Sequence, residues 1–420
     1  MNQNNNPSPN SDQRPEENAT HARQAPISAD ASAVEETIKK KRPIDLDEYI
    51  PNVVWPSARR GVRFERMTRA NAQAANALTN LVFGLERPIE HFMWKFWENP
   101  AGDPVAWMGL DSETGEIQSE NIGLSKKVRV KGQDAKCIML CESATRPSAR
   151  GGGLIYKGVT SCVGIDAGAS GFTFAYGGQS TDDAIKIGKR WFGYRVAFAL
   201  DVWEKRLSFA PALEHRLGAF GRLLAPLADL FLSSQEAATS SFQFEEVAEC
   251  GEEFDELWSR HRDQYALCFF RTAQILNWRY VNCPIGPNRI VLARKNGRAV
   301  GYVIWREGRV NGIPIATILD LWHGDESGVA EALLAHASIA ARVSGATCLR
   351  FAVHKGGAEH RAIMQLKNTR PSPFEKEDRV IVTPLPMAVD VATEGDYGIM
   401  RAAIDGRNWY YTQGDCDYLD

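Results

Sequence analysis

A glycine-rich turn in the first half of the chain joins an apolar run to a helical pattern. The apolar run begins at Cys137 and leads through ESATRPSA to Arg150 and three glycines, and the helical pattern begins at Leu154. We therefore expect a strand, a loop and a helix in that order. Glycines let a backbone approach a ligand closely, and the first turn of a helix offers N–H groups without intrahelical partners. Such a junction can bind a pyrophosphate.

Two common phosphate-binding motifs do not fit this turn. A Walker loop requires GxxxxGK[ST], and no Lys-Ser or Lys-Thr pair follows Gly153. A dinucleotide-binding turn requires GxGxxG, and Tyr156 stands where its third glycine belongs.

The turn resembles motif A of the GNAT superfamily of acyl-CoA N-acyltransferases, whose signature is [QR]xxGx[GA] after a strand. Arg150 matches the first position and Gly153 the fourth, whereas Ile155 stands where Gly or Ala is usual. The longer segment ESATRPSARGGGLI resembles the pattern DTATHPxxRGxG of tandem GNAT proteins. The resemblance implies that the turn binds acetyl-CoA or another acyl-CoA. The residues implied in cofactor binding are Ser143, Ala144, Thr145, Arg150, Gly151, Gly152, Gly153, Leu154 and Ile155.

Acyl transfer to an amine needs a proton acceptor, because a lysine-type amine has a pKa near ~10.4 and is mostly protonated at neutral pH. Glu142 matches the acidic position of the tandem pattern and lies on the expected strand, so it is the candidate general base. An ion-paired strand carboxylate is the alternative interpretation. Backbone N–H groups near Ala144 and Thr145 are expected to contact the pantetheine or the developing oxyanion.

The sequence lacks the tyrosine that is usual as the general acid in the GNAT enzymes it resembles. GNAT enzymes often carry a Tyr four residues before a Gly-Phe or Gly-Trp step, and the corresponding position before Gly193-Tyr194 is Lys189. Tyr176 and Tyr194 are the substitute catalytic candidates, and each is also a candidate core side chain.

The elements that must position these residues follow the GNAT order. The sequence predicts a strand at 61–67, a helix at 68–81, a helix that begins at Pro88 and ends at Asn99-Pro100, and strands at 104–110 and 127–130 before the glycine turn. The first unit then continues with a helix at 154–165, a strand at 171–176, a helix at 182–191 and a strand at 195–203.

A second unit repeats this order. FFRTAQILNWRYVNCP echoes HFMWKFWENP of the first unit, which indicates a duplicated fold. We expect a helix at 255–262, strands at 290–294, 299–305 and 315–321, a helix at 329–343 and a strand at 348–353. Asp325 and Glu326 replace the glycine turn and would repel a pyrophosphate, so we predict that one unit alone binds the thioester.

The predicted fold class is α/β (α+β), with two tandem GNAT-like units that are each a mixed twisted sheet flanked by helices. The predicted domains are a disordered tail at 1–43, an acyl-CoA-binding domain at 44–207, a helical connector at 208–241 and a second, degenerate domain at 242–420. The tail lacks aromatic residues, which is typical of disorder. Arg222, Pro226 and Asp229 interrupt the apolar connector, so no integral membrane segment is expected, and a helix lying on a membrane surface is the alternative.

Composition and charge narrow the function classes. The chain has 420 residues and a net charge of −3, which gives no general attraction to nucleic acid. Its eight cysteines contain no CxxC pair, which is typical of reduced thiols in a cytoplasmic protein. His323 and His354 lack ligand-like spacing, so no metal cofactor is predicted. A homo-oligomer is left open.

The resemblance implies an N-acyltransferase, expected to be an N-acetyltransferase, whose partner is a small-molecule amine or amino sugar. The first alternative is a catalytically silent CoA-binding or scaffold pseudoenzyme, which Ile155 and Lys189 favour. The second is a Fem-like aminoacyltransferase, although no strongly basic groove is evident. The end of the chain, WYYTQGDCDYLD, resembles the WYxTxGDxD ending of tandem GNAT proteins. Asp415 and Asp417 there are candidates for binding an acceptor amine or a metal, or for capping the chain end.

Overall fold

The computed structural model describes residues 61–151, 153–178, 181–233, 241–354, 358–372, 378–385 and 393–417. The predicted disordered tail at 1–43, the predicted start of order near Ile44, and Gly152 lie outside these ranges.

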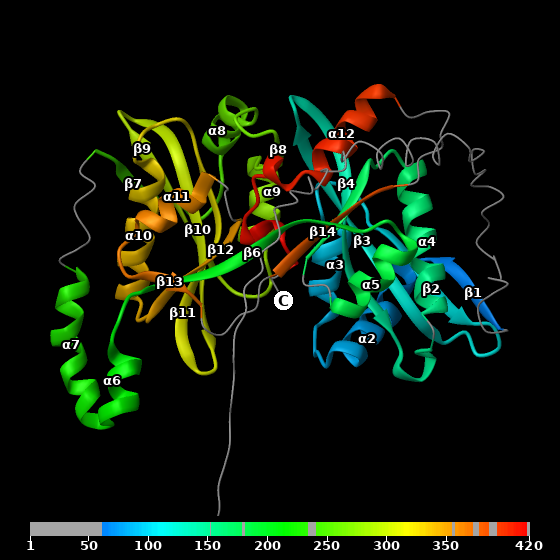
Figure 1. Ribbon diagram of the computed structural model, residues 1–420, viewed down its shortest axis with the longest axis horizontal. Coiled ribbons are helices and arrows are strands. Elements are labelled where there is room, and N and C mark those ends of the chain that lie inside the picture. Colours follow the sequence, from blue (N-terminus) through cyan, green and yellow to red (C-terminus); the bar gives the residue numbers. More distant parts are fainter. Residues whose placement is uncertain are drawn as a thin grey trace, which may run out of the picture. The chain divides into compact units, whose positions relative to one another are not determined.

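One mixed sheet of fourteen strands runs through the described residues (Figure 1). Its main path is β1-β2-β3-β4-β5-β14-β6-β12-β11-β10-β9-β7, with β8 paired to β3 and β13 paired to β6. Helices flank this sheet, so the predicted mixed α/β fold is confirmed.

The first half of the chain contributes six strands and the helices that cover them. The strands are β1 (Val62–Arg66), β2 (Val105–Asp111), β3 (Ile117–Val130), β4 (Gln133–Thr145), β5 (Phe174–Gly177) and β6 (Arg195–Arg206). The helices are α2 (Ala72–Phe83), α3 (Ile89–Trp97), α4 (Leu154–Ala169) and α5 (Asp182–Trp191). A hairpin of α6 (Ala210–Leu217) and α7 (Ala219–Ser233) follows.

The second half contributes the remaining strands. They are β7 (Gln243–Glu246), β8 (Leu267–Phe269), β9 (Asn288–Lys295), β10 (Arg298–Val310), β11 (Ile313–His323), β12 (Cys348–His354), β13 (Thr369–Pro371) and β14 (Asp378–Pro384). The helices are α8 (Glu252–His261), α9 (Ala273–Leu276) with the π-helical turn Asn277–Val281, α10 (Val329–Val343), α11 (Ala358–Gln365) and α12 (Glu394–Ile404).

Several predicted elements differ in their bounds from the observed ones, and two of them do so for clear local reasons. The helix expected from Thr68 begins at Ala72, because Thr68 and Asn71 cap each other and Arg69–Asn71 forms a 3-10 turn. The strand expected at 127–130 is the end of the longer strand β3. Its first half was missed because it carries polar side chains, including Ser119 and Asn121, that are nevertheless buried.

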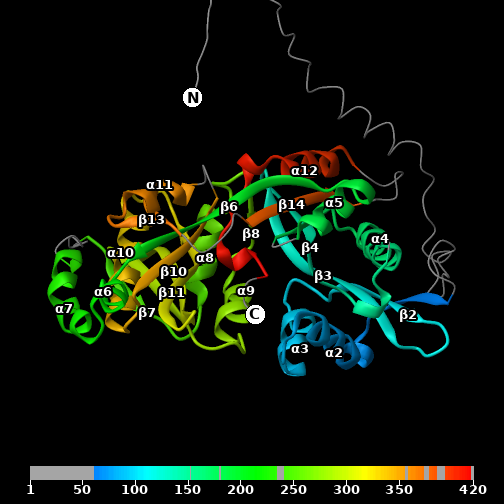
Figure 2. The ribbon, with the colours of Figure 1, turned by 60° about the horizontal axis from the view of Figure 1, so that its bottom comes forward.

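Helices α2 and α3 lie on one side of β4 and α4 lies on the other (Figure 2), and alternate residues of β4 pack against them. Cys137 and Met139 pack in the core cluster that contains residues of α2 and α3, whereas Ile138 packs with residues of α4. This alternation is the period of two expected for a strand covered on both faces.

Each half contains a short parallel pair of strands that then separate. In the first half, β4 and β5 pair over Cys137–Met139, after which β4 continues without β5. In the second half, β11 and β12 pair over Ile315–Thr317, after which β11 continues without β12 and stays paired to β10. The echoed aromatic segments also meet: Trp94 and Trp278 stack at 5.5 Å between ring centroids, and each indole Nε1 donates to the other residue's carbonyl at 2.9 Å.

Candidate functional site

A bulge in β4 turns the candidate base Glu142 toward α2 and α3. Glu120 pairs with Ala144, but Ile122 pairs with Cys141, so β4 carries one extra residue at this point. Glu142 has a backbone φ of +48°, a left-handed conformation that is uncommon outside glycine. Strict alternation would have placed its side chain on the α4 face beside Ile138.

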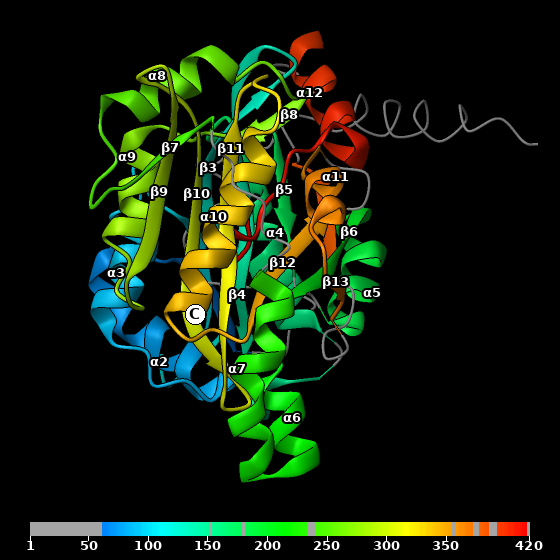
Figure 3. The same ribbon diagram turned by 90° about the vertical axis from the view of Figure 1, so that its left-hand side faces the viewer.

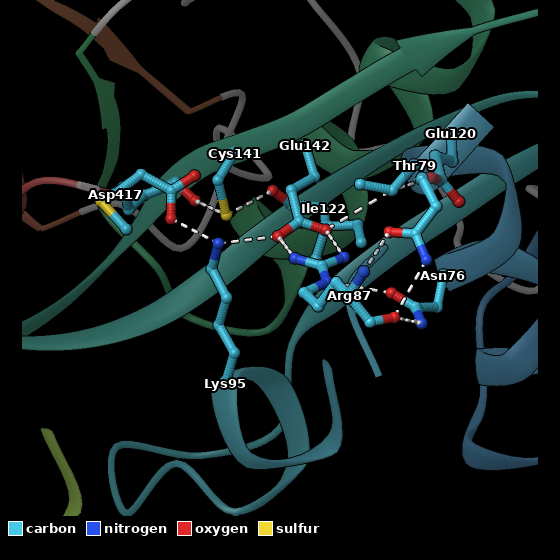
Figure 4. A network of polar contacts seen from close by, with 11 residues as sticks. Asn76, Thr79, Arg87, Lys95, Glu120, Ile122, Cys141, Glu142 and Asp417 are labelled. Carbon is cyan, nitrogen blue, oxygen red and sulfur yellow. Dashed lines mark hydrogen bonds and ion pairs between the residues drawn. The ribbon is translucent and has the colours of Figure 1, made fainter. Parts of the chain in front are cut away.

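Two cations hold the Glu142 carboxylate (Figure 4). Arg87 donates to both oxygens, at 2.5 and 2.7 Å, and Lys95 Nζ donates at 2.7 Å. Lys95 also forms an ion pair with Asp417 at 2.5 Å. The Arg87, Lys95 and Glu142 side chains are all buried. Paired and hydrogen-bonded ions of this kind can remain charged in a low-dielectric interior.

A second buried carboxyl lies beside this network. Thr79 Oγ1 donates to Glu120 Oε1 at 2.5 Å and lies 3.5 Å from Glu142 Oε2 (Figure 4). Burial raises the pKa of Glu120 well above its ordinary value, and the negative charge of Glu142 acts in the same direction. The Glu120 carboxyl therefore keeps its proton to a higher pH than an exposed glutamate does.

A cavity of about 450 Å³ opens where β4 leaves β5. Its walls include Glu142 and Ser143 of β4, Tyr156 of α4, and Tyr194. Later parts of the chain also reach it, namely Ile381 of β14 and Asp417. The Tyr156 hydroxyl lies near those of Tyr194, Ser143 and Thr160, and burial raises the pKa of Tyr156 and of Tyr194. Both phenols are therefore protonated at neutral pH.

The glycine turn leads directly into α4. Arg150 is exposed, and its Nε donates to the carbonyl of Thr145 at 3.1 Å. Gly153 is the N-cap of α4 with a φ of +68°, which a residue with a Cβ adopts at a cost. The helix start therefore presents free N–H groups beside the end of β4.

Ile155, which departs from the GNAT signature, points into the core. It is 6% exposed and packs with Val159 and other residues of α4, β1 and β2. A Cβ on Gly109 would lie 3.0 Å from its Cγ2, so a glycine in β2 provides the space for this larger side chain. The isoleucine that replaces the usual Gly or Ala therefore packs on the core side of α4.

Three of the site residues predicted from the sequence lie together in the cavity wall, whereas Tyr176 lies outside it. Glu142, Ser143 and Tyr194 line one cavity. Ala144 is buried in β4, and its carbonyl accepts a hydrogen bond from Ser119. Tyr176 is fully buried, and its hydroxyl donates to the carbonyl of Asp415 at 2.9 Å rather than lining the cavity.

The corresponding strand separation in the second half is filled by the chain's own end. The turn Gln413–Asp415 contacts β11, and a Cβ on Gly414 would lie 1.8 Å from the Tyr280 hydroxyl. Arg271 ties this turn in place through ion pairs with Asp320 at 3.1 Å and Asp415 at 2.8 Å. A ligand between β11 and β12 would have to displace these contacts.

Sequence reasoning did not select Arg87, Lys95, Thr79, Glu120 or Tyr156. Lys95 did carry a signal, because it follows Phe92 by three residues on a helix whose other side chains are mostly aromatic. A lysine is rarely buried without a partner, so its position on that apolar stripe indicates a carboxylate nearby. Arg87 lies in the connection before α3 and carries no comparable pattern.

The described ranges contain neither a metal-binding cluster nor a membrane-spanning helix. No group of three or more His, Cys, Asp or Glu side chains there could hold a metal ion. None of the helices in the described part of the chain has the length and apolar character needed to cross a membrane.

Comparison with known proteins found no matching family model and no matching curated protein. Solved structures do match. A conserved protein from Enterococcus faecalis V583, described as a probable N-acyltransferase, has a TM-score of 0.57 at 13% identity over 78% of this chain and 73% of that one. A GCN5-related N-acetyltransferase from Anabaena variabilis ATCC 29413 has a TM-score of 0.57 at 13% identity over 76% and 72%.

A eukaryotic enzyme matches as well. An N-myristoyltransferase from Saccharomyces cerevisiae, solved with bound myristoyl-CoA, has a TM-score of 0.54 at 10% identity over 82% of this chain and 83% of that one. At these identities the likeness concerns the backbone arrangement. The chain therefore has the fold of the GCN5-related N-acetyltransferases and of N-myristoyltransferase.

Proposed function

We propose that the chain is an acyl-CoA-dependent N-acyltransferase that moves an acyl group, acetyl in the first instance, to an amine of a small molecule or amino sugar. The observation that carries the proposal is the separation of β4 from β5 after Met139, with a cavity of about 450 Å³ beside the start of α4. The fold shared with acetyl- and myristoyltransferases supports it. The free thiols of all eight cysteines support a cytoplasmic location.

The residues at the point where β4 separates from β5 can bind an acyl-CoA. Beyond Met139 the edge of β4 that faced β5 has no strand partner among the described residues, and an extended edge can pair with the amide groups of a pantetheine. Arg150, Gly151 and Gly153 stand at the positively polarised start of α4, where a pyrophosphate binds favourably. When bound, the cosubstrate supplies the thioester that the amine attacks.

In the proposed mechanism, the amine nitrogen forms a bond to the thioester carbon while the carbon–sulfur bond breaks. Glu142 takes the proton of the attacking amine, directly or through water. Tyr194, whose raised pKa keeps it protonated at neutral pH, donates a proton to the leaving sulfur. Its place in the cavity wall supports Tyr194 over Tyr176 for this step. Arg87 and Lys95 position the Glu142 carboxylate.

A CoA-binding protein without turnover is the second candidate. It is favoured by the hydrogen bonds that Arg87 and Lys95 already make to both oxygens of Glu142. An amine would have to compete with two buried cations for this carboxylate. Binding and turnover must therefore be measured separately.

Calorimetric titration with acetyl-CoA and with CoA tests the proposed site. We expect micromolar binding, about −8 kcal/mol, for the parent protein. Gly151→Glu adds a carboxylate at the exposed glycine turn and should abolish binding by repelling the pyrophosphate. Gly308→Glu is the matched control, because Gly308 is an exposed glycine on β10 with open space around it.

The outcomes separate the candidates. Retained affinity in Gly151→Glu would contradict the site assignment. Binding without release of free thiol across a library of small amines would favour the CoA-binding protein. Binding with amine-dependent thiol release would support the acyltransferase.

A further inference from the structure

A second cavity lies at the far end of β6 from the first one. Its volume is about 610 Å³, within the range of about 300–1,000 Å³ that small-molecule pockets occupy. Residues of β6, α6, β12, β13 and the β10–β11 hairpin enclose it. Figure 3 shows α6 and the tip of that hairpin at the same end of the sheet. The first cavity lies at the beginning of β6, next to Tyr194.

The strand register gathers three arginines on one face of the sheet. Glu204 of β6 pairs with Arg350 of β12 and with Arg370 of β13. Arg206, two residues after Glu204, pairs with Cys348. Directly paired residues, and residues two apart on a strand, project from the same face. All five of these residues line the cavity.

This face of the sheet carries three arginine side chains and only one carboxylate, that of Glu204. The Glu204 carboxylate accepts from Arg350 at 3.2 Å and from Ser372 at 2.8 Å. Arg206 and Arg370 form no ion pair with any residue in the described ranges. Burial and the neighbouring charge of Arg370 lower the pKa of Arg206. An anion between these two guanidinium groups would relieve their repulsion.

Beyond those five residues, the cavity wall holds five apolar side chains and five polar ones, Glu214 and His215 among the latter. Val310, Ile313 and Ile315 come from the β10–β11 hairpin, and Pro211 and Ala212 come from α6. A fully polar ligand such as inorganic phosphate would leave these side chains without a matching surface. The two kinds of wall together match a ligand with an anionic head and an apolar body.

We propose that this cavity binds a small amphipathic carboxylate, with its head on Arg206 and Arg370 and its hydrocarbon body against Ile313 and Ile315. A guanidinium group matches the planar geometry of a carboxylate with two parallel hydrogen bonds. This site is separate from the acyl-CoA cavity, and the inference does not depend on the proposed acyltransferase activity.

Calorimetric titration of the full-length chain with decanoate, decanol and inorganic phosphate tests the ligand class. We expect saturable decanoate binding, with decanol and phosphate at least about tenfold weaker. Arg206→Gln and Arg370→Gln should each weaken decanoate binding about tenfold. Arg309→Gln is the control, because Arg309 is an exposed arginine of the same hairpin that is absent from the cavity wall.

Several results would overturn the proposal. Decanol binding as tightly as decanoate would exclude recognition of the carboxylate, and phosphate binding as tightly would exclude the apolar contribution. Undiminished decanoate binding in the Arg206→Gln/Arg370→Gln variant would place the ligand elsewhere. Thermal melts of each variant check that the chain remains folded, and neither arginine forms an ion pair that the substitution would break.

Cys348 provides a readout of where the ligand sits. It is the partly exposed member of the eight cysteines, since the other seven are buried. Burial raises the pKa of its thiol to about 11, so alkylation by iodoacetamide is best followed near pH 9 or above. Saturating decanoate should slow the alkylation of Cys348 at least about fivefold, and saturating acetyl-CoA should leave decanoate affinity unchanged. An unchanged alkylation rate, or competition by acetyl-CoA, would contradict the assignment.

Discussion

At the scale of single residues, Glu142 combines backbone strain with charge pairing. Its φ of +48° lies in a region that costs a non-glycine residue about 1–2 kcal/mol. Arg87 and Lys95 offset that cost by contacting both carboxylate oxygens. Strained residues held by their surroundings are frequent at functional sites, so the bulge supports a role for Glu142 beyond folding.

Glu142→Gln is expected to spare acetyl-CoA binding and slow turnover. It should also lower the free energy of unfolding by about 3–5 kcal/mol, because Arg87 and Lys95 lose their buried counter-charge. Urea unfolding, calorimetry and thiol release measure the three quantities. Glu65→Gln, which breaks the more exposed pair with Arg63, should cost no more than about 1 kcal/mol. Unchanged turnover would remove Glu142 from the mechanism.

Glu120 makes the stability of the protein depend on pH. Its folded carboxyl keeps a proton to a higher pH than the unfolded one, whose ordinary pKa is 4.5. Stability from this group is therefore present below 4.5 and is lost as pH rises through the folded pKa. Glu120→Gln cannot ionise, so its stability relative to the parent should rise by about 1.4 kcal/mol per pH unit across that interval. Urea unfolding between pH 5 and 8 checks this. If the difference in unfolding free energy between Glu120→Gln and the parent stays constant with pH, Glu120 is ionised in the folded protein.

At the scale of elements, the position of α4 depends on one glycine. A Cβ on Gly158 would lie 2.1 Å from the ring of Phe64 in β1, so the helix packs closely there. The same helix begins at Gly153, beside the end of β4. A shift of α4 away from β1 would therefore move the predicted pyrophosphate site.

Gly158→Ala is expected to destabilise the protein by about 1–3 kcal/mol through overpacking, and to weaken acetyl-CoA binding. Gly398→Ala in α12 is the matched control. Nothing lies within 4 Å of a Cβ at Gly398, so that change should instead stabilise by up to about 1 kcal/mol through helix propensity. Adding Phe64→Leu to Gly158→Ala should recover part of the loss, which a double-mutant cycle in urea measures. Equal effects of the two alanine substitutions would refute this packing argument.

At the scale of the whole described structure, the two halves share one sheet. β14, from the end of the chain, lies between β5 and β6, and β6 in turn pairs with β12. The first cavity therefore depends on late residues such as Ile381 and Asp417. A domain boundary near residue 207 would separate strands that are hydrogen-bonded to one another.

We expect the full-length chain to unfold in a single cooperative transition. Scanning calorimetry should give a ratio of calorimetric to van't Hoff enthalpy of about one. A fragment of residues 61–207 lacks β14 and leaves β5 and β6 without their shared neighbour, so it should show no cooperative melt. Two resolved transitions, or a cooperatively folded fragment, would instead support two independent domains.

The sequence by itself determined the order and kind of most elements, because these depend on nearby residues. The predicted helix at 182–191 matches α5, which Thr181 caps by accepting from Ala184 N–H, and the helix at 329–343 matches α10. Helical periodicity and caps act within about four residues, so they can be interpreted without the fold. The glycine turn and its following helix are equally local.

Only the tertiary structure decided how the candidate site is assembled. Strict alternation along β4 would place Glu142 on the same face as Ile138, and the bulge turns it to the other face. That bulge depends on pairing with β3, and the side chains that hold Glu142 come from Arg87 and Lys95, at least 47 residues earlier. The insertion of β14 between β5 and β6 joins residues 178 to 210 positions apart, from the pair Asp378–Leu200 (378 − 200) to the pair Pro384–Phe174 (384 − 174). Such pairings depend on which strand edges and charges meet in space, and no local pattern encodes that choice.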